Sequence, residues 1–467
     1  MQSQKVSLPW RNHSDECQKQ KPVKHQHRKL LPPLLAVVLL GVFAAGARAD
    51  VLFTYGYSAR GIGMAGAMSA TADDFAAAYY NPAGAVFQRR PSFGVGYLVT
   101  GSMMSGIGID APKLKHTQGM LFGMTLPLPL GGFLRERLAF GFASFFPNGL
   151  LLGIHVPYPT DPQYVILQNS GQSLTTIPTL AIKVLKGLAI GGGAQIFDNT
   201  AGEFTAVVEP NGAVNATVGE ELTANYVAIA GIMFRPGEYW DAVRGLSIGL
   251  VFRDRFYTYY RIPVNSYISS VPLAVYFSAF SAYTPRQWVA AVAYSTGRWL
   301  WEGDVSFNQW SYFPDPNLKV DVHLKIPVLP VTFRNSTRYP PHFHDTFTVR
   351  AGTEVTAYQG EDLNFLVRAG YSFDPSPVPP QTGDTNYLDT ARHIGGLSLG
   401  LQWNGVGAFR FETPFAFDFG FQAQYLTPRT SYKAESVSSD NKGYPKVGFT
   451  GWLYAVVVTV GTQFDFE

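Results

Sequence analysis

The chain has 467 residues, of which 46% are hydrophobic and 14% aromatic, while only 15% are charged. It has 36 Lys and Arg residues against 33 Asp and Glu residues, but eight of the basic and two of the acidic residues lie in the first 49 positions. The remaining chain therefore has a net charge near −3, which excludes the basic surface that nucleic-acid binding requires.

The first 49 residues have the pattern of an export signal. A basic front precedes the apolar run "LLPPLLAVVLLGVFAA", and Ala47-Arg48-Ala49 fits a small-x-small cleavage site. We predict that residues 1–49 are a signal peptide and that the mature chain begins near Asp50. Cys17, the only cysteine, would leave with this peptide, so no disulfide is expected.

Residues 55–85, "YGYSARGIGMAGAMSATADDFAAAYYNPAGA", contain a match to the dinucleotide-binding pattern GxGxxG at Gly61, Gly63 and Gly66. That pattern needs a preceding strand and a following helix within a βαβ unit. Only five residues separate the expected mature start from Tyr55, and Asn81-Pro82-Ala83 breaks the chain before any second strand. We therefore predict tight turns between short helices that pack inside a larger structure.

After residue 90 the dominant pattern is alternation of apolar and polar residues. In "FAFDFGFQAQY" (415–425) the odd positions are apolar and the even positions are small or polar, as expected for a strand with one apolar and one polar side. Fourteen such segments begin near residues 92, 118, 137, 173, 187, 222, 245, 284, 298, 345, 362, 393, 415 and 447. No run of about 18 apolar residues after position 50 predicts a membrane helix.

The connections between these segments alternate between short and long. Residues 295–298 and 358–362 form short turns, whereas the long connections are 149–172, 201–221, 261–283, 314–344, 374–392 and 429–446. Outer-membrane barrels have this asymmetry, and a sheet can span hydrocarbon only when it closes and leaves no unpaired edge. Trp and Tyr at segment ends fit interfacial girdles, namely Trp288, Trp299, Trp310, Trp403, Trp452 and Tyr454. The fold prediction is an all-β, 14-stranded antiparallel transmembrane barrel; a secreted β-sandwich is the alternative.

Two segments suggest how a solute could pass. In "RLAFGFASFFPNGLL" Pro147 cannot donate a ladder hydrogen bond and Asn148-Gly149 favours a bend, so the third strand is either interrupted or simply ends there. The loop at 261–283 is too apolar for an ordinary external loop, and exposed apolar patches commonly mark ligand grooves. Its candidate docking residues are Val271, Leu273, Val275, Tyr276 and Phe277; alternatively, the loop packs on itself over the mouth.

Several charged residues fall on inward positions of the expected strands, and opposite charges there commonly neutralise one another. They are Arg253, Arg255, Glu302, Asp304, Arg350, Glu354 and Arg368. A substrate carboxylate could still meet one arginine of this set. His342, His344 and Asp345 lack an evident further metal ligand, and no G-x-S-x-G accompanies the histidines. We predict no enzyme activity, no metal and no cofactor.

The ordered motifs together resemble the FadL family of outer-membrane transporters for long-chain fatty acids and other hydrophobic compounds such as toluene. The resemblance covers the chain from about residue 50 to the end. Its motifs include "VFRDR" with Arg253, "WEGDVSFNQWSYF", "RAGYSFDPSPVP" with Arg368, and "LDTARH" with Asp389 and Arg392. At the N-terminal end the matching residues are Gly61, Gly63, Ala65, Gly66, Ala67, Ala72, Asp73, Asp74 and Asn81-Pro82-Ala83.

The resemblance implies a hatch (residues 50–90) that plugs a barrel (residues 91–467), with external binding, hatch rearrangement and lateral exit through the wall. It places the wall opening beside the Asn81-Pro82 turn, and we add Phe145 and Phe146 to the predicted substrate-binding set, with Arg253 and Arg368 as its leading arginines. The predicted gating set comprises Gly61, Gly63, Gly66, Asp73, Asp74, Asn81, Pro82, Ala83, Pro147, Asn148 and Gly149. The strand near 187–201 lacks the basic residue that fatty-acid members tend to carry.

The predicted function is passive uptake of hydrophobic compounds, either long-chain fatty acids or aromatic hydrocarbons, in the outer membrane. The predicted partners are the solute and outer-membrane lipid, with no nucleic acid, and the chain is expected to be a monomer. A general porin would instead need an open lumen, and an adhesion barrel would use its external loops as a binding surface.

Overall fold

A computed structural model describes residues 51–467 except 113, 115, 149–157, 168–173, 209–213, 269–270, 318, 325–330, 335–338, 407–408 and 465–467. The described residues belong to one compact unit, Ala45–Glu467. The predicted signal peptide (1–49) and Gly149 lie outside the described residues.

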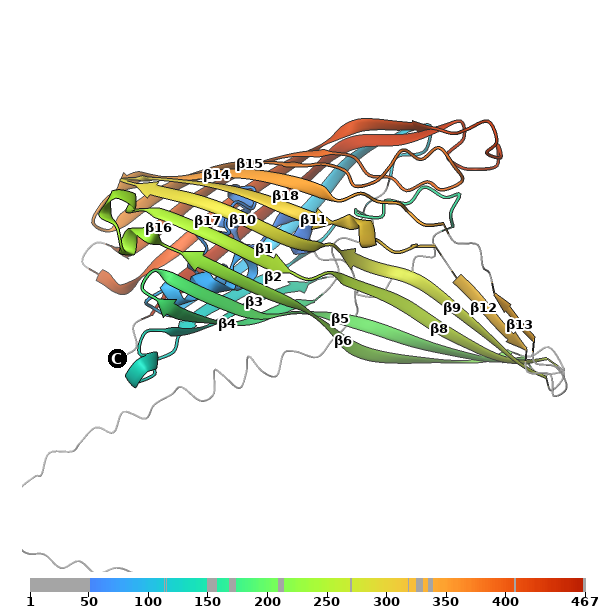
Figure 1. Cartoon of the computed structure of the whole chain (residues 1–467), viewed down its shortest axis with the longest axis horizontal. Coiled ribbons are helices and arrows are strands. Elements are labelled where there is room, and N and C mark those ends of the chain that lie inside the picture. The colour runs from blue at the N-terminus through green and yellow to red at the C-terminus, as the bar shows by residue number, and fades with distance from the viewer. Residues whose placement is uncertain are drawn as a thin grey trace, which may run out of the picture. The chain divides into compact units, whose positions relative to one another are not determined.

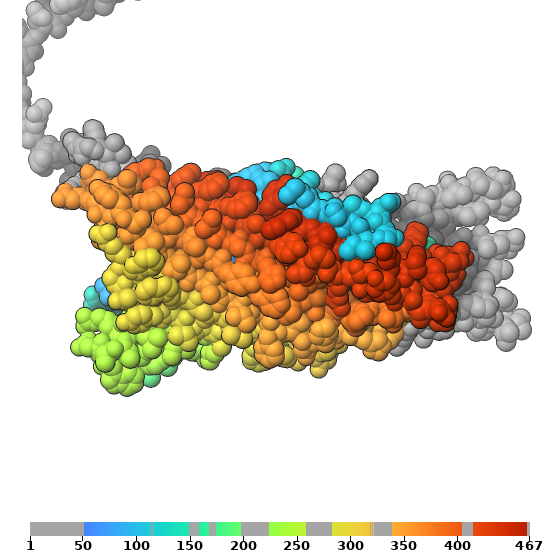
Figure 2. Space-filling model, turned by 90° about the horizontal axis from the view of Figure 1, so that it is seen from above, coloured from blue at the N-terminus to red at the C-terminus, as the bar shows by residue number. Residues whose placement is uncertain are grey.

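Fourteen antiparallel strands pair in a closed ring. Each strand pairs with the next in chain order, and the last, β18, pairs with the first, β1, from Ser92 opposite Gln463 to Ile107 opposite Gly448. The closure is visible in Figure 2, where the light-blue β1 lies against the red C-terminal strands. The prediction of a 14-stranded barrel is therefore confirmed. The ring consists of β1 (Ser92–Ile107), β2 (Gln118–Pro127), β3 (Leu138–Pro147), β4 (Thr175–Leu185), β5 (Leu188–Val208), β6 (Val214–Phe234), β7 (Leu246–Arg253), β10 (Arg286–Thr296), β11 (Trp299–Gln309), β14 (Thr346–Gln359), β15 (Leu363–Asp374), β16 (Arg392–Val406), β17 (Phe409–Tyr432) and β18 (Lys446–Gln463).

The alternation in sequence becomes an apolar outside and a polar inside. On β17 Phe417 and Phe419 are 38% and 42% exposed on the outer face, while Gln422 and Gln424 are buried on the inner face. Because successive side chains of a strand point to opposite faces, the same period exposes Leu397 and Leu399 on β16 and buries Ser398 between them. An apolar exterior of this kind suits a bilayer.

The connections at the two ends of the ring differ as predicted. At the end where β1 begins and β18 ends, Gly187 and Gly297 adopt positive φ in tight turns. At the opposite end, the connections at 148–174, 310–345, 375–391 and 433–445 are long. Since the strand number is even, both ends of the barrel chain lie on the short-turn side.

Two of the predicted long loops contain further strand instead. Residues 201–221 continue β5 and β6, which remain paired from Leu188–Phe234 to Val208–Val214. Residues 261–283 belong to a second hairpin, β8 (Phe256–Ile268) and β9 (Val271–Thr284), which extends β7 and β10 beyond the ring. With β12 (Lys319–Leu324) and β13 (Val331–Arg334), these strands project past the other strand ends in Figure 1. The expectation of a loop at 261–283 was wrong: the described residues of this segment form paired strands, which satisfy their backbone groups.

The described part of the predicted hatch, residues 51–90, lies inside the ring (Figure 1). It contains three short helices, α2 (Val51–Tyr55), α3 (Ser58–Gly63) and α4 (Ala77–Tyr80), and the 3-10 helix η1 (Pro82–Phe87). Its Tyr57, Ile62, Met64 and Met68 are fully buried in one cluster with wall residues, which include Leu98, Leu121 and Ile177. None of the helices among the described residues has the length and apolar character needed to cross a bilayer.

Candidate functional site in the lumen

Glycines of the hatch allow close packing both within the hatch and against the wall. A Cβ at Gly61 would collide with the Tyr80 hydroxyl, and one at Gly63 would collide with Ser398 of β16. Of the glycines Gly61, Gly63 and Gly66, only Gly66 has a positive φ, at +83°, a backbone conformation that residues with a side chain rarely adopt. The predicted turn role therefore fits Gly66, whereas Gly61 and Gly63 lie in or at the end of α3 and serve close packing.

The Asn81-Pro82-Ala83 turn is held between the hatch and the wall. Asn81 is fully buried, and its Nδ2 donates to the Ser69 carbonyl at 2.7 Å and to the Ile232 carbonyl of β6 at 3.1 Å. Its Oδ1 accepts from the Ala83 backbone N–H at 3.1 Å, which caps η1 with Pro82 at its first position. One amide thus fixes the turn and ties it to the wall.

Ion pairs fasten the short-turn side of the hatch. Arg60 on α3 lies 3.0 Å from Glu354 of β14 and 3.3 Å from Asp74. Arg368 of β15, only 4% exposed, bridges Glu354 at 2.5 Å and Asp418 at 2.6 Å. Asp73 reaches Arg235 at 2.9 Å. The predicted gating residues Asp73 and Asp74 and the predicted substrate arginine Arg368 therefore belong to one hatch-to-wall network, and a substrate role for Arg368 stays a prediction.

A pair of buried acidic residues on β11 binds the middle of the hatch. Glu302 accepts from the Ala70 backbone N–H at 2.6 Å and from the Thr71 hydroxyl, while Asp304 accepts from the Ser69 hydroxyl at 2.7 Å. Ser247 of β7 donates to the Ala70 carbonyl at 2.7 Å. The expected ion-pair ladder is therefore only partly present. These two carboxylates accept hydrogen bonds from hatch groups, and neither forms a salt bridge with an arginine among the described residues.

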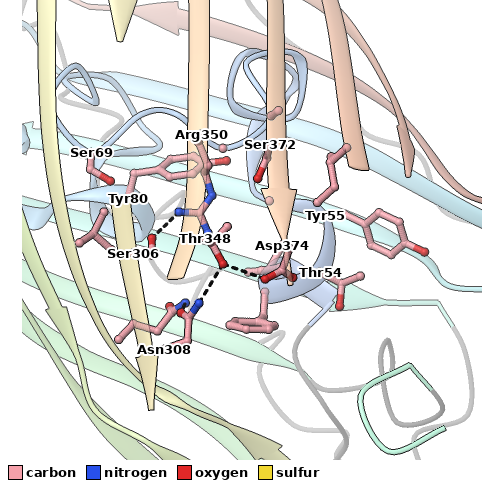
Figure 3. Close-up of a pocket in the computed structure, with 18 of the residues that line it drawn as sticks. Thr54, Tyr55, Ser69, Tyr80, Ser306, Asn308, Thr348, Arg350, Ser372 and Asp374 are labelled. Carbon is pink, nitrogen blue, oxygen red and sulfur yellow. Dashed lines mark hydrogen bonds between the residues drawn. The ribbon is translucent and has the colours of Figure 1, made fainter. Parts of the chain in front are cut away.

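The cavity on the long-loop side of the hatch is lined by polar and apolar residues in similar measure, and Figure 3 shows its polar side chains. It holds about 840 Å³ of empty space, counted with the part open to solvent. Thr348 donates to Asp374 at 2.7 Å and accepts from Asn308 at 2.9 Å, and Arg350 donates to Ser306. In Figure 3 these wall side chains face Tyr80, Ser69, Thr54 and Tyr55 of the hatch.

Arg253 lines this cavity beside the hatch. Its guanidinium donates to the Tyr79 carbonyl at 2.6 Å and to Gln287 at 3.3 Å, and it stacks 4.8 Å from the centre of the Tyr79 ring. Its buried Nε makes no hydrogen bond among the described residues. The geometry supports a hatch-holding role, and the predicted carboxylate contact of Arg253 stays a prediction.

The predicted wall-opening residues on β3 do not meet the Asn81-Pro82 turn in any described contact. β3 approaches the hatch at Gly141, which lies against Ala78, and Phe145 is four residues further along, or about 13 Å at the rise of a strand. Phe145 is fully buried on the inner face, and Phe146 faces outward. The pairing of β3 with β2 is continuous to Pro147, where the strand ends. This agrees with the alternative that the third strand simply ends there, and the interruption stays a prediction because residues 149–157 lie outside the described residues. Asn148 follows and hydrogen-bonds Tyr97 at 2.7 Å.

An aromatic cluster closes over the long-loop side. Phe313 stacks on Phe343 at 4.5 Å, and Trp310 packs against Tyr283 and, at 6.1 Å, against Phe53 of the hatch. Trp310 is only 3% exposed, so its predicted place in a lipid girdle was wrong. The side chains of the predicted docking residues Val271, Leu273, Val275, Tyr276 and Phe277 lie outside the described residues.

Above this cluster, hydrogen bonds join the external loops. The Gln163 side chain donates to Asn317 at 2.9 Å, and Asn317 donates to the Tyr387 hydroxyl at 2.7 Å. Lys433 donates to the carbonyls of Gly383 and Thr385, both at 2.7 Å. Burial lowers the pKa of Lys433 to about 8, with nearby Asp384 acting in the opposite direction. Burial raises the pKa of Asp389 in the same loops to about 6, against the effect of Arg392.

Sequence reasoning missed the residues of the wall that receive the hatch. Three wall glycines lie so close to the hatch that a Cβ would collide with the hatch backbone or with Asn81. They are Gly191 on β5, Gly231 on β6 and Gly249 on β7. The run "GGG" at 191–193 was a visible signal. Arg60 was also missed, because a single arginine in a helical stretch gives no sign of a partner 294 positions away.

The chain was compared with known protein families, sequences and solved structures. The chain matches the family described as outer membrane protein transport protein (OMPP1/FadL/TodX) over residues 40–466. A Pseudomonas aeruginosa FadL homologue is similar in structure, with 13% identity and a TM-score of 0.54, covering 88% of this chain and 98% of its own. The Pseudomonas putida toluene transporter TodX has 13% identity and a TM-score of 0.50, covering 88% and 100%. No curated protein sequence matches the chain.

The family match spans most of the chain, so the resemblance seen in the motifs is confirmed. The closed ring of fourteen strands agrees with the fold of both solved structures. The chain therefore belongs to the outer membrane protein transport protein family (OMPP1/FadL/TodX), whose members are transport channels and not enzymes.

Proposed function

We propose that the chain is an outer-membrane channel for passive uptake of hydrophobic compounds, with a hatch at residues 50–90 inside a barrel at residues 91–467. The observation that carries this proposal is that the lumen is filled by a segment held to the wall by hydrogen bonds and ion pairs on several strands. A general porin needs an open polar passage, and this segment occupies it.

Hydrophobic solutes and lateral release fit this arrangement. An apolar molecule gains about 25 cal/mol per Å² on transfer from water into hydrocarbon, so release into the bilayer is favourable without an energy source. A route straight to the periplasm would cross the second cavity, between the hatch and the short-turn end, which is lined by charged residues such as Arg60, Asp74 and Arg368. That lining favours an exit through the wall.

The two similar structures suggest the two substrate classes to test. One is a FadL homologue and the other is a toluene transporter. Polar residues of the cavity on the long-loop side of the hatch can bind the head of an amphiphile, namely Arg253, Arg350 and Asn308. The aromatic cluster on the same side can contact an apolar tail. Long-chain fatty acids and aromatic hydrocarbons are therefore the two candidate classes of solute.

The test is uptake of radiolabelled oleate and toluene by cells that lack their own transporter. Cells with the wild-type chain are compared with cells that carry a Pro82→Gly variant, a deletion of residues 51–90, or an empty vector. We expect faster uptake of at least one compound with the wild type, and reduced uptake with Pro82→Gly. Equal uptake of both compounds by wild-type and empty-vector cells would refute the proposal.

The external-loop adhesion alternative is tested with the same strains. The variant lacks the connection at 433–445, whose ends at β17 and β18 are paired. If the chain is an adhesion barrel, this deletion abolishes binding of the protein partner. If the chain is a transport channel, the deletion leaves a measurable uptake rate.

A further inference from the structure

Four turns at the short-turn end of the ring form one continuous surface, which we call the turn surface. Its segments, which include the adjoining strand ends, are residues 128–137, 183–187, 235–245 and 295–298. Neighbouring turns are joined by backbone hydrogen bonds of 2.7, 2.8 and 2.9 Å, which run from Arg235 to Gly187, from Lys183 to Arg137 and from Ser295 to Gly245. Figure 1 shows these turns at the left-hand end of the ring. A partner that lies along this end would therefore meet all four.

The turn surface is basic. It has seven Lys and Arg residues and three acidic residues, a net charge of +4, although the chain after residue 49 has a net charge near −3. Arg135, Lys186 and Arg298 are exposed, and none of them forms a salt bridge within the part of the chain that the structure describes. The neighbouring turn between β14 and β15 instead carries Glu361 and Asp362 and no cation. The sector of the rim that contains the turn surface therefore attracts anions.

Large apolar side chains are exposed between these cations. Phe133 is 75% exposed and Trp240 is 61% exposed. The guanidinium carbon of Arg137 lies 4.5 Å from the centre of the Phe133 ring, so a cation and an aromatic ring share one place on the surface. Further exposed apolar residues of the turn surface include Leu130, Leu185 and Tyr239. Aromatic side chains with this exposure suit the boundary between hydrocarbon and lipid headgroups.

The turn surface continues into the apolar outer face of the wall. Trp299 directly follows Arg298 at the start of β11 and stacks on Trp301, with 5.7 Å between the ring centres. Both are exposed on the outer face, as is Tyr294 of β10, which lies opposite Trp301. Trp and Tyr in such positions mark the level of the headgroups. Because long side chains place the charge of Lys and Arg away from the backbone, the cations of the turns can reach that level.

We infer that the turn surface binds the phosphate groups of anionic phospholipids in the leaflet next to the short turns. The exposed cations meet the phosphates, while the exposed aromatic and aliphatic residues lie among the upper parts of the acyl chains. A headgroup with a net negative charge fits this surface better than a zwitterionic headgroup, whose amine carries the same charge as the protein. The inference concerns the lipid around the barrel and goes beyond the proposed passage of a solute through it.

The arrangement favours a lipid leaflet over a soluble partner. Arg135, Lys186 and Arg298 lie on three different turns, each beside apolar side chains that face outward or toward the rim. A leaflet presents phosphates along the whole rim, so it can meet separate cations at once. A free phosphate ion would need cations that converge on one point, and a soluble protein would leave the apolar residues next to the bilayer without a role.

Lipid selectivity of the purified protein tests the inference. The protein is reconstituted in phosphatidylcholine bilayers that contain a trace of spin-labelled phosphatidylglycerol or spin-labelled phosphatidylcholine, and electron spin resonance gives the ratio of their association with the protein. We expect a ratio of about five in favour of phosphatidylglycerol, the factor that one cation near the membrane surface supplies. The preference should largely disappear at about 1 M salt, where the Debye length is about 3 Å.

Three sets of variants assign the preference to the turn surface. Lys186→Gln/Arg298→Gln should lower the ratio severalfold, and further addition of Arg135→Gln should abolish the preference. The charge-keeping variant Lys186→Arg/Arg298→Lys should retain it. Lys442→Gln/Lys446→Gln removes two exposed cations from the long-loop side and should leave the ratio unchanged.

The fluorescence of Trp240 tests whether lipid or water surrounds the 235–245 turn. The difference between the emission of the wild-type protein and that of Trp240→Phe isolates this residue. Phosphatidylglycerol with bromine near the headgroup end of its acyl chains should quench Trp240, and should do so more than the same amount of brominated phosphatidylcholine. If neither lipid quenches Trp240, the turn lies in water, a soluble partner is the better occupant, and the inference is wrong.

The remaining outcomes are equally decisive. Equal association of the two spin-labelled lipids with the wild-type protein would overturn the inference. A preference that survives the neutralising substitutions, or one that is lost in the charge-keeping variant, would also overturn it. The proposed function is tested separately by uptake of oleate and toluene, so loss of the lipid preference would leave the transport proposal standing.

Discussion

At the scale of single residues, the structure concentrates function in side chains that connect the hatch to the wall. Asn81 is the clearest case. The amide nitrogen of Asn81 donates to the carbonyls of Ser69 and Ile232, and its amide oxygen accepts from the backbone N–H of Ala83. An aliphatic residue could supply neither, and a carboxylate would face two carbonyl groups. The asparagine of the NPA sequence is thus explained by three hydrogen bonds.

Asn81→Ala should loosen the hatch. It leaves the buried Ser69 carbonyl without this donor, and such a loss costs about 1–3 kcal/mol. We expect higher ion conductance in planar bilayers and faster proteolysis within residues 51–90. Gln88→Ala, which removes a half-buried amide without a described side-chain hydrogen bond, is the control. Unchanged conductance and proteolysis in Asn81→Ala would contradict the assigned role.

Arg60→Met should destabilise the protein strongly, because it removes the cation next to Glu354 and Asp74 in a buried setting. Breaking one partner of a buried pair costs about 3–5 kcal/mol. Thermal unfolding in detergent measures the change. Arg244→Met is the matched control, since its pair with Asp241 is exposed and worth under about 1 kcal/mol. Equal melting temperatures of the two variants would refute the buried-network interpretation.

At the scale of elements, the long connections form a connected cap and not separate loops. Ala434 donates to Thr382, Gln163 donates to Asn386, and Asn386 reaches Asn441 at 2.7 Å. Because a backbone hydrogen bond that is shielded from water is slow to open, these residues should be among the better protected parts of the long-loop side.

The stability of this cap should depend on pH in two steps. The pKa of Asp389 is raised to about 6 from about 3.9 unfolded, so the folded form binds more protons and stability falls as pH rises from about 4 to about 6. The pKa of Lys433 is lowered to about 8 from about 10.4 unfolded, so stability rises between those values. The cap is therefore least stable between about pH 6 and 8.

Hydrogen exchange of residues 381–391 and 433–445, corrected for the intrinsic pH dependence of exchange, measures this profile. Asp389→Asn should remove the fall on the acidic side, and Lys433→Met should remove the rise on the basic side, each leaving the other arm in place. A protection profile that changes in one direction only across pH 4–10 would contradict the assignment.

At the scale of the whole molecule, the barrel and the hatch are separate in topology. The ring closes through β1 and β18, and no residue of the hatch pairs into a described strand ladder. Removal of the hatch would therefore leave every described ladder in place and join the cavities on its two sides.

Deleting residues 51–90 should give a folded but open pore. We expect an unchanged strand-rich circular dichroism spectrum, high single-channel conductance and uptake of small polar solutes, whereas the wild-type chain conducts weakly. The physical reason is that the inner face exposed by the deletion is lined by residues such as Glu302, Arg350 and Gln422. A deletion variant that remains non-conducting would show that another element closes the lumen.

The fold could be read from the sequence because a barrel strand carries its own pattern. The alternation at 415–425 and the short turn at 295–298 are local, and fourteen repeats of that pattern with no apolar helix leave few other folds. The apolar stretch at 261–283 was misread as a loop, because apolarity alone does not separate an external loop from a strand pair that continues beyond the ring.

The sequence alone indicates the fourteen strands of the ring, the direction of their faces, the alternation of short and long connections and the family, since each depends on neighbours in the chain. The wall residues that contact the hatch become apparent in the folded chain and not before. Asn81 meets Gly231 across 150 residues, and Arg60 meets Glu354 across 294. Such contacts depend on strand register and on ring closure, and no local pattern of residues records either.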